Sequence, residues 1–436
     1  MNLNKLKKLY VKAPFFVKKI YALIPFKYRQ GLEYRNWRKY LDEQKPSLKR
    51  NPNDVVKKAF ENFAFYKSFY HHIDLQDWER IPLLEKNKIQ ESLDEFENYE
   101  VSKFYVTTGG VTGKPAKFFQ SKNVWAKEMA FVYYFFKMNG YKPTIKKVSF
   151  RGGDFSNLKN DRFWKHNPNN NEVHFSPFHL NKETVYEYVS ELNKIKPSYF
   201  HGYPSSFLTL AKLMSKEGLQ LNYKPNAFFL ISEGYNRKDI LFLESFFNCK
   251  MKSFYGHSER LVFAVGDETL ENYTPNLDYG YMELVDENGK VIKENDILGE
   301  IVGTSYDNEA MPLIRYKTGD YTSYTDYSTK TFGSIQGKWG QTVLFGRGGE
   351  EITLTALNLH SQELDDVLRL QFIQVSNGVI KLLIMFTIEK NETEIKVIEN
   401  LLSSRVGNLI HFAITVTDNF ILNKRGKSSL IINENK

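Results

Sequence analysis

The sequence predicts an α/β protein with a large multi-sheet N-terminal domain and a small α+β C-terminal domain. Three observations carry this prediction. Helices alternate with short apolar strands over residues 181–254, turn-linked strands follow from residue 281, and a glycine-rich stretch over 328–349 precedes a short final α+β segment. We therefore expect a basic arm over 1–50, a large domain over 51–345 and a small mobile domain over 346–436.

The arm holds nearly all of the charge imbalance. The 436-residue chain has a net charge of +9, and its first 40 residues contain eleven Lys and Arg against one acidic residue, Glu33. The rest of the chain is therefore close to neutral, which argues against nucleic acid as a partner. Apolar residues between the lysines would suit contact with an anionic membrane face. An arm packed on its own domain is the alternative.

Cysteine content and hydropathy indicate where the protein works. Cys249 is the only cysteine, which excludes an intrachain disulfide and a multi-cysteine metal site and favours a reducing compartment. No apolar run approaches the length of a transmembrane span. We expect a cytoplasmic protein, with the inner membrane face as a further place of contact for the arm.

The most informative stretch is YVTTGGVTGKPAKFF, residues 105–119. Glycine N–H groups, hydroxyls and one lysine are suited to binding phosphate oxygens. Pro115 excludes the Walker loop, and β-favouring residues on both sides predict strand, loop, strand. A glycine-rich hairpin turn without a ligand is the alternative. The candidate phosphate ligands are Thr107, Thr108, Gly109, Gly110, Thr112, Gly113 and Lys114.

The following segment predicts a parallel sheet. A helix over 123–137 precedes strands over 148–150, 198–201, 227–231 and 251–254, with helices ending at 194 and covering 205–214 and 238–247 between them. Ligands of such sheets lie at the carboxyl ends of the strands. Polar residues follow three of these strands and indicate a site there, although each group alone could be an ordinary loop: His201 and Tyr203; Ser232, Glu233 and Gly234; Tyr255, Gly256, His257, Ser258 and Glu259.

The last third predicts antiparallel strands at 281–285 and 299–305, followed by MPLIRYKTGD at 311–320. For the small domain we expect a helix over 361–370, a strand over 379–388, a helix over 392–402 and a strand over 411–417.

Five separated motifs give the chain its resemblance to a known family. TTGGVTGKP, YGHSE, MPLIRYKTGD, Gly346-Arg347 and Gly426-Lys427 occur in the order found in the adenylate-forming superfamily of acyl-CoA synthetases, nonribosomal adenylation domains and luciferases. Within it the chain looks most like the phenylacetate-CoA ligase branch and its capsular polysaccharide biosynthesis relatives. The similarity covers roughly residues 100–430.

The resemblance implies a Mg²⁺- and ATP-dependent ligase that adenylates a small carboxylic acid and then transfers the acyl group to an amine, a sugar hydroxyl or CoA. It also points towards a role in surface polysaccharide biosynthesis. It implies that the loop from Thr107 to Lys114 holds the β- and γ-phosphates, Glu259 the metal and Asp320 the ribose. The other implied roles are adenine contact by Tyr255 and by Ser232, Glu233 and Gly234, α-phosphate contact by Ser258 near Gly256, and a position beside the ribose for Arg347. Catalysis is assigned to Lys427, with Lys424 as the alternative. His201, Tyr203 and His257 are candidates for substrate contact, and a hydrogen-bonded structural role is the alternative for both histidines.

Departures from the family pattern leave the acceptor open. Gly349 and Glu350 stand where the hinge usually has an Asp pair, and Ala356 stands where thioester-forming relatives usually have glycine beside the pantetheine tunnel. A methyl group there argues against CoA as acceptor. A phenylacetate-type CoA ligase and a nucleotide-binding scaffold of polysaccharide assembly that has lost its chemistry are the alternatives.

Overall fold

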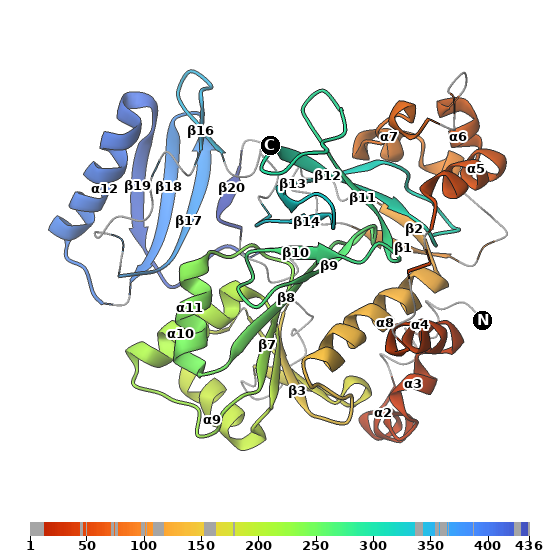
Figure 1. The fold of residues 1–436 in the computed structure, drawn as a ribbon. Helices are drawn as coiled ribbons and strands as arrows, with labels where there is room; N and C mark the ends of the chain where they lie inside the picture. The colour runs from red at the N-terminus through yellow and green to blue at the C-terminus, as the bar shows by residue number, and fades with distance from the viewer. Residues whose placement is uncertain are drawn as a thin grey trace. The chain divides into compact units, whose positions relative to one another are not determined.

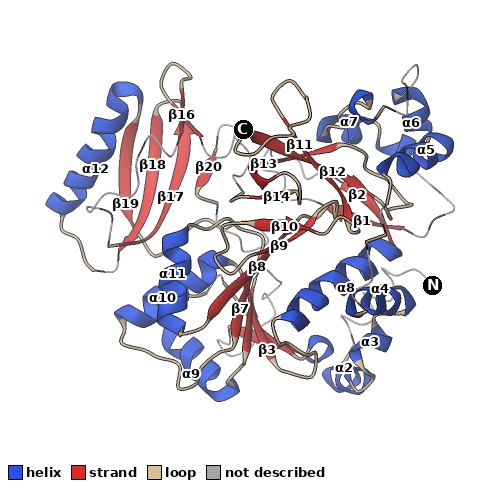
Figure 2. Cartoon of the chain, in the orientation of Figure 1, coloured by secondary structure: helices blue, strands red, loops and turns tan. Residues whose placement is uncertain are grey.

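The computed structural model describes residues 13–43, 47–48, 50–70, 74, 77–96, 101, 103–107, 117–151, 163–177, 179–335, 343–353, 357, 364, 366–386, 388–422 and 429–434. The chain divides into two compact units. Unit 1 comprises Met1–Lys146, Asn167–Glu172 and Lys252–Gln336, and unit 2 comprises Lys147–His166, Val173–Met251 and Gly337–Lys436. Figures 1 and 2 show the elements of each unit.

Unit 1 is built on an antiparallel run of strands. In sheet order these are β11 (Gly280–Val285), β12 (Leu298–Ser305), β13 (Tyr316–Asp326), β14 (Thr331–Phe332), β10 (Tyr273–Pro275), β9 (Phe263–Gly266) and β8 (Lys250–Gly256). Each neighbouring pair in this run is antiparallel. The predicted antiparallel strands at 281–285 and 299–305 are thus confirmed as β11 and β12.

A separate hairpin of unit 1 carries the glycine-rich stretch. Strand β1 (Lys103–Thr107) pairs antiparallel with β2 (Lys117–Ser121), and Thr107 opposite Lys117 is the last pair of the ladder. This confirms the predicted strand, loop, strand order. The intervening residues 108–116 lie outside the described residues.

Helices of the N-terminal part complete unit 1. They are α2 (Phe15–Ala22), α3 (Phe26–Arg29), α4 (Leu32–Asp42), α5 (Pro52–Asn62), α6 (Ala64–Phe69), α7 (Lys86–Glu91) and α8 (Lys122–Met138). From α3 onward the arm packs on its own domain: the ring centroids of Phe26 and Tyr133 lie 4.4 Å apart, and those of Trp37 and Phe131 lie 5.6 Å apart. Of the helices described, none combines the length and hydropathy needed to cross a membrane.

Unit 2 contains the predicted strands over 148–150, 198–201 and 227–231 within a longer sheet, together with the helices between them. The strands run in the order β7 (Ala227–Leu230), β6 (Tyr199–Gly202), β3 (Lys147–Phe150), β5 (Glu172–Phe175) and β4 (Trp164–Asn167). Pairs β3–β6 and β6–β7 are parallel, as predicted. The helices α9 (Val185–Ile195), α10 (Pro204–Lys216) and α11 (Arg237–Phe247) follow the predicted alternation closely.

The C-terminal part of unit 2 is a four-stranded sheet in the order β19 (His411–Val416), β18 (Val379–Phe386), β17 (Val367–Ser376) and β20 (Ile431–Asn433), with a short hairpin of β15 (Val343–Phe345) and β16 (Glu351–Thr353). Figure 2 shows α12 (Glu392–Val406) against this sheet, and its Ile398 and Leu402 share a core with Phe372. The predicted helix over 361–370 is wrong from residue 367, because β17 begins there and pairs with β18 and β20.

Candidate functional site

The second strand of the glycine hairpin is held directly against the YGHSE motif. The side chain of Gln120 is 1% exposed, and its Nε2 donates to the carbonyl oxygen of Ser258 at 2.7 Å. Asn308 fixes the same strand, since its Nδ2 donates to the carbonyl oxygen of Phe119 at 2.9 Å and its Oδ1 accepts from the backbone N–H of Ser121 at 3.1 Å. Unit 1 therefore brings the hairpin and the Tyr255–Glu259 segment together.

The same unit joins the YGHSE motif to the TGD motif. Tyr255 at the end of β8 donates its hydroxyl to Oδ2 of Asp320 at 2.9 Å, and its side chain is 8% exposed. Burial, followed by the charge of Asp320, raises the pKa of Tyr255 well above its ordinary value. The tyrosine is therefore a neutral donor that orients the carboxylate. The backbone N–H of Asp320 donates to Oγ1 of Thr318 at 3.1 Å, which closes the turn at Gly319.

A second carboxylate, Glu259, lies in the same group of residues. Its Oε2 lies 3.2 Å from Nδ1 of His257, and its Oε1 accepts from the hydroxyl of Tyr316 at 3.4 Å. Burial and then Glu259 raise the pKa of Tyr316. The Nε2 atom of His257 is buried and has no hydrogen-bond partner among the described residues. Buried polar atoms usually have a partner, so substrate contact by His257 stays a prediction.

This arrangement fits a magnesium ion held partly by substrate. Among the described residues no group of three or more His, Cys, Asp or Glu side chains gathers as metal ligands. Mg²⁺ in nucleotide-using enzymes is commonly held by one or two carboxylates together with phosphate oxygens and water. The single carboxylate of Glu259 therefore meets the requirement without a closed protein cage.

An internal ion pair positions the RYKTGD segment, and the sequence reasoning missed its role. Arg315 is 1% exposed, and its Nε donates to Oε1 of Glu283 at 2.7 Å, while Nη1 donates to the carbonyl oxygen of Ile81 at 2.6 Å. The nitrogen of the Trp78 indole donates to Oε2 of Glu283 at 3.0 Å. Arg315 stands in an apolar run and Glu283 in an apolar strand, and that pattern is the signal that indicates a buried pair.

Unit 2 carries the predicted site residues of β6 and of the turn after β7. His201, 7% exposed, lies on β6, and Tyr203 follows that strand and is also buried. Oε2 of Glu233 accepts from the backbone N–H of Ser205 at 3.1 Å, so the turn after β7 is bonded to the start of α10. Within that turn Ser232 has φ +65° and is exposed, as is Gly234.

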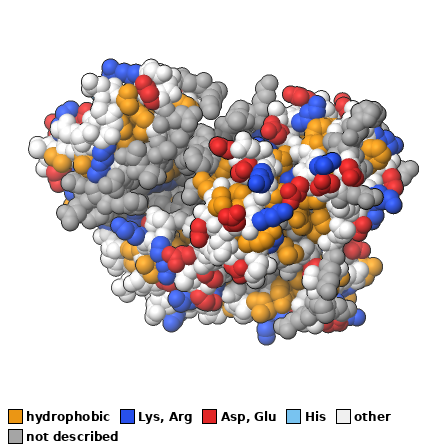
Figure 3. All heavy atoms as spheres, turned by 45° about the horizontal axis from the view of Figure 1, so that its top comes forward, with side chains coloured by type: hydrophobic (Ala, Val, Ile, Leu, Met, Phe, Trp, Pro, Cys, Tyr) orange, Lys and Arg blue, Asp and Glu red, His pale blue; other side chains and the backbone are white. Residues whose placement is uncertain are grey.

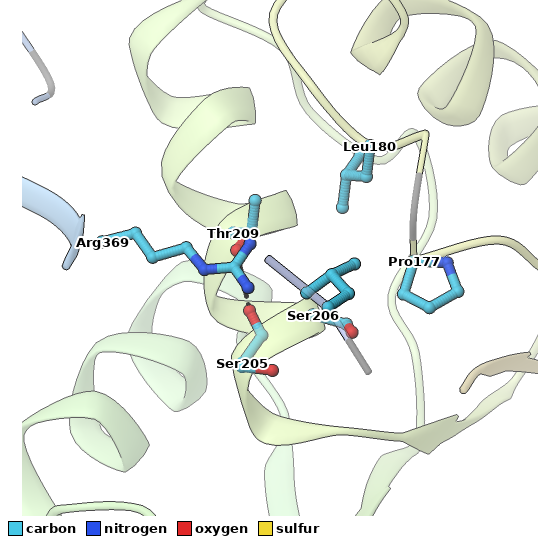
Figure 4. Close-up of a pocket in the computed structure, with 7 residues that line it drawn as sticks. Pro177, Leu180, Ser205, Ser206, Thr209 and Arg369 are labelled. Carbon is cyan, nitrogen blue, oxygen red and sulfur yellow. Dashed lines mark hydrogen bonds between the residues drawn. The ribbon is translucent and has the colours of Figure 1, made fainter. Parts of the chain in front are cut away.

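A small pocket of unit 2 lies against the start of α10. In Figure 4 Arg369 of β17 reaches towards Ser205 and Thr209, with Leu180 and Pro177 across from it. Burial lowers the pKa of Arg369 to about 10 against the opposing charge of Glu233. The guanidinium carbon also lies 4.5 Å from the ring centroid of Phe420. The pocket is completed by Ser206 and Leu422.

Arg347 occupies a separate turn of unit 2. Its backbone N–H donates to the carbonyl oxygen of Leu409 at 3.0 Å, and Oε2 of Glu350 accepts from the backbone N–H of Gly348 at 3.0 Å. Glu350 thus closes this turn. Thr107 ends β1, whereas the other predicted phosphate ligands, Thr108, Gly109, Gly110, Thr112, Gly113 and Lys114, and also Ala356 and Lys427, lie outside the described residues.

Comparisons with known proteins agree with the resemblance read from the motifs. No protein-family model matches the chain. The chain is 26% identical over 373 residues to Protein CapK of Staphylococcus aureus, covering 82% of this chain and 80% of the relative. The chain is similar in structure to 2-hydroxyisobutyryl-CoA ligase in its postadenylation state in complex with R3-HIB-AMP, with a TM-score of 0.66, 15% identity and 88% of each chain covered.

It is also similar to the AtGH3.15 acyl acid amido synthetase in complex with 2,4-DB, with a TM-score of 0.56 and 13% identity over 84% of this chain and 86% of the other. One of these solved structures is named as a CoA ligase and the other as an amido synthetase. Both share an architecture with this chain. The chain therefore has the fold of the adenylate-forming ligases.

Proposed function

We propose that this protein is an ATP-dependent ligase that activates a carboxylic acid as its acyl adenylate. A carboxylate oxygen attacks the α-phosphorus of ATP, and the bond from that phosphorus to the bridging oxygen breaks, so that pyrophosphate leaves with the bonding electrons. The acceptor's lone pair then attacks the acyl carbon, AMP leaves, and the acceptor's proton is released. Both steps bring anions together, so charge neutralisation and positioning dominate catalysis.

The convergence of three motifs in unit 1 is the observation that supports this proposal best. Gln120 joins the glycine hairpin to Ser258, Tyr255 joins the YGHSE motif to Asp320, and Tyr316 joins the TGD segment to Glu259. A chance set of loop residues would not be hydrogen-bonded in this way. Of two carboxylates, one can accept from both hydroxyls of a ribose diol and the other can bind a metal ion through its oxygens.

The roles proposed for individual residues follow the resemblance. Asp320 accepts both ribose hydroxyls, with Arg347 beside it, and Glu259 holds Mg²⁺, which supplies positive charge to the phosphates when bound. Tyr255 and the turn of Ser232, Glu233 and Gly234 contact adenine. Ser258 contacts the α-phosphate. The phosphates are held by Thr107, Thr108, Gly109, Gly110, Thr112, Gly113 and Lys114, and Lys427 donates to the reacting oxygens. His257, His201 and Tyr203 are the proposed acid contacts.

The acceptor is proposed as an amine, a sugar hydroxyl or a thiol. The structural relatives are named as a CoA ligase and an amido synthetase, so the fold accommodates more than one acceptor. Ala356, where thioester-forming relatives usually have glycine, favours an acceptor other than CoA. The similarity to Protein CapK supports the expected place in surface polysaccharide biosynthesis, with the reaction taking place in the cytoplasm, where ATP is available, and beside the membrane.

ATP–pyrophosphate exchange tests the first half-reaction without knowledge of the acceptor. The purified protein is assayed with panels of aryl, amino and sugar acids. We expect exchange with one class of acid, and a loss of about 10- to 100-fold in kcat/KM for ATP in Asp320→Asn, since hydrogen bonds to charged groups contribute about 1.5–3 kcal/mol. Glu259→Gln should reduce exchange further and raise the Mg²⁺ concentration needed.

The matched control is Glu294→Gln, which changes an exposed glutamate of the same unit. It should leave exchange unchanged. ATP binding measured by calorimetry with no exchange for any acid would instead support the nucleotide-binding scaffold. Release of AMP that requires CoA would support the phenylacetate-type CoA ligase.

A further inference from the structure

Helix α2 carries an unusual amount of exposed apolar surface. None of its residues is buried. Phe16 is 64% exposed, Ile20 is 62% exposed, and Leu23, which caps the helix, is 81% exposed. Large apolar side chains gathered in this way on a protein surface mark an interaction site more often than chance exposure.

The apolar side chains of this segment share one side of the helix. At about 100° per residue, Phe16, Ile20 and Leu23 fall within about 60° of one another, Lys18 falls on the opposite side, and Lys19 falls beside Leu23 at the edge of the apolar side. Val17 and Ile24 extend the apolar side and are also exposed. The segment is thus amphipathic. The long side chain of Lys19, at the edge of the apolar side, lets its ammonium group extend beyond the apolar side chains.

The surroundings of α2 are basic and aromatic. Between Phe15 and Arg35 the chain has one acidic residue, Glu33, against five basic ones: Lys18, Lys19, Lys27, Arg29 and Arg35. Elsewhere basic and acidic side chains are interspersed, as on the face drawn in Figure 3. The cations lie over aromatic rings, with Lys19 5.0 Å from the Phe15 centroid and Lys27 5.1 Å from that of Tyr28, which is itself 55% exposed.

The segment is anchored to the folded body at its C-terminal side. Phe26 is 7% exposed and packs on Tyr133 of α8, and Nη1 of Arg29 donates to the carbonyl oxygen of Asn169 at 2.5 Å. Figure 1 shows α2, in red, before this anchored region and next to α3 and α4. The body therefore holds α2 while Phe16, Ile20 and Leu23 stay largely exposed.

We propose that α2 and the turn to α3 are a docking surface for the headgroup region of an anionic lipid bilayer. The apolar side enters the boundary between headgroups and acyl chains, and Lys18, Lys19, Lys27 and Arg35 bind lipid phosphates. This charge is what selects a membrane over a second copy of the chain, because two copies meeting at α2 would bring their positive charges together. The bilayer would be a partner of the proposed ligase, but vesicle binding can be measured whether or not the protein has ligase activity.

Vesicle flotation tests the docking surface with the full-length protein. Phosphatidylcholine vesicles with and without phosphatidylglycerol are compared, and we expect binding only to the anionic vesicles. Raising the salt from about 0.1 M to about 1 M, which shortens the Debye length from about 10 Å to about 3 Å, should weaken it. Lys19→Ala with Lys27→Ala should reduce the partition coefficient about fivefold per lysine.

The decisive variant replaces Phe16, Ile20 and Leu23 by serine and should lose vesicle binding by tenfold or more. Its matched control replaces Leu241, Ile388 and Val397, exposed apolar residues of unit 2, by serine and should bind as the wild type does. Equal binding by both variants, or no binding by the wild type, would overturn the proposal. A wild-type dimer in light scattering that the first variant abolishes would also overturn it, in favour of a second copy as occupant. ATP–pyrophosphate exchange in solution should be the same in all variants.

Discussion

The hydroxyl of Tyr255 donates to Oδ2 of Asp320 across 2.9 Å, although the two residues lie 65 positions apart. The bond joins the end of β8 to the turn within β13 in unit 1. Because the tyrosine is buried and remains neutral, it donates to one carboxylate oxygen of Asp320 and holds that carboxylate in place. The hydrogen bond therefore links the YGHSE and TGD motifs within the proposed nucleotide site.

Replacing Tyr255 by phenylalanine removes this donor while keeping the ring. We expect KM for ATP in the exchange assay to rise by up to about tenfold with a smaller change in kcat, since a typical hydrogen bond contributes about 0.5–1.5 kcal/mol and the contact is made in ground and transition states alike. Tyr186→Phe is the control, because Tyr186 also donates to a carboxylate, Glu217, at an exposed position of unit 2. Equal effects in the two variants would contradict an orienting role for Tyr255.

Removing the guanidinium of Arg315 should destabilise the protein strongly. In Arg315→Met the carboxylate of Glu283 stays buried without its cation, which typically costs about 3–5 kcal/mol. Urea unfolding measures the change. Arg315→Met with Glu283→Gln should recover part of it, because the amide oxygen still accepts from Trp78. Lys252→Met, which breaks the pair with exposed Glu268, should cost less than about 1 kcal/mol.

Stability should fall at acidic pH partly through Asp307. Burial would raise its pKa, but hydrogen bonds from Arg50 at 2.6 and 2.8 Å and the charge of Lys127 outweigh this and lower the pKa below 3.8. The folded state thus favours the ionised form, so this contribution is fully present above the unfolded pKa and is lost as the pH falls through the folded pKa.

Asp307→Asn should therefore be less stable at neutral pH, and its unfolding free energy should depend less on pH between about pH 5 and about pH 3. Urea titrations across this range measure the difference. Asp296→Asn, at an exposed position of the same unit, should follow the wild type. A variant curve parallel to the wild-type curve throughout would refute the assignment.

Substitution by alanine should destabilise the protein at one glycine of unit 2, Gly202, and leave its stability unchanged at another, Gly234. A Cβ at Gly202 would lie 2.2 Å from the carbonyl oxygen of Phe150, so Gly202→Ala must push β3 and β6 apart and should cost about 1–3 kcal/mol or more. A Cβ at Gly234 would meet no atom within 4 Å, so Gly234→Ala should keep the wild-type stability. Thermal unfolding separates the two. Because Gly234 belongs to the proposed adenine turn, its variant reports on ATP binding in a folded protein.

Local pattern predicts most elements well and fails where long-range pairing competes with it. The expected helix over 361–370 contains good helix formers at helical spacing, yet β17 begins at Val367. Phe372 on this strand is fully buried, and the strand pairs with β18 on one side and β20 on the other. Strand β18 follows directly in a hairpin, but β20 lies about sixty residues away, and a local window does not contain it.

The sequence alone determined the local elements, the order of the motifs and the residue types that carry the proposed chemistry, because periodicity, turn residues and charge act over a few neighbouring positions. Only the tertiary structure decided that Gln120 reaches Ser258, that Tyr255 orients Asp320 and that Arg315 is buried against Glu283. It also decided that the arm packs from α3 onward and leaves α2 exposed. These outcomes depend on contacts between residues far apart in the chain, where packing and burial select one arrangement among many that the local pattern permits.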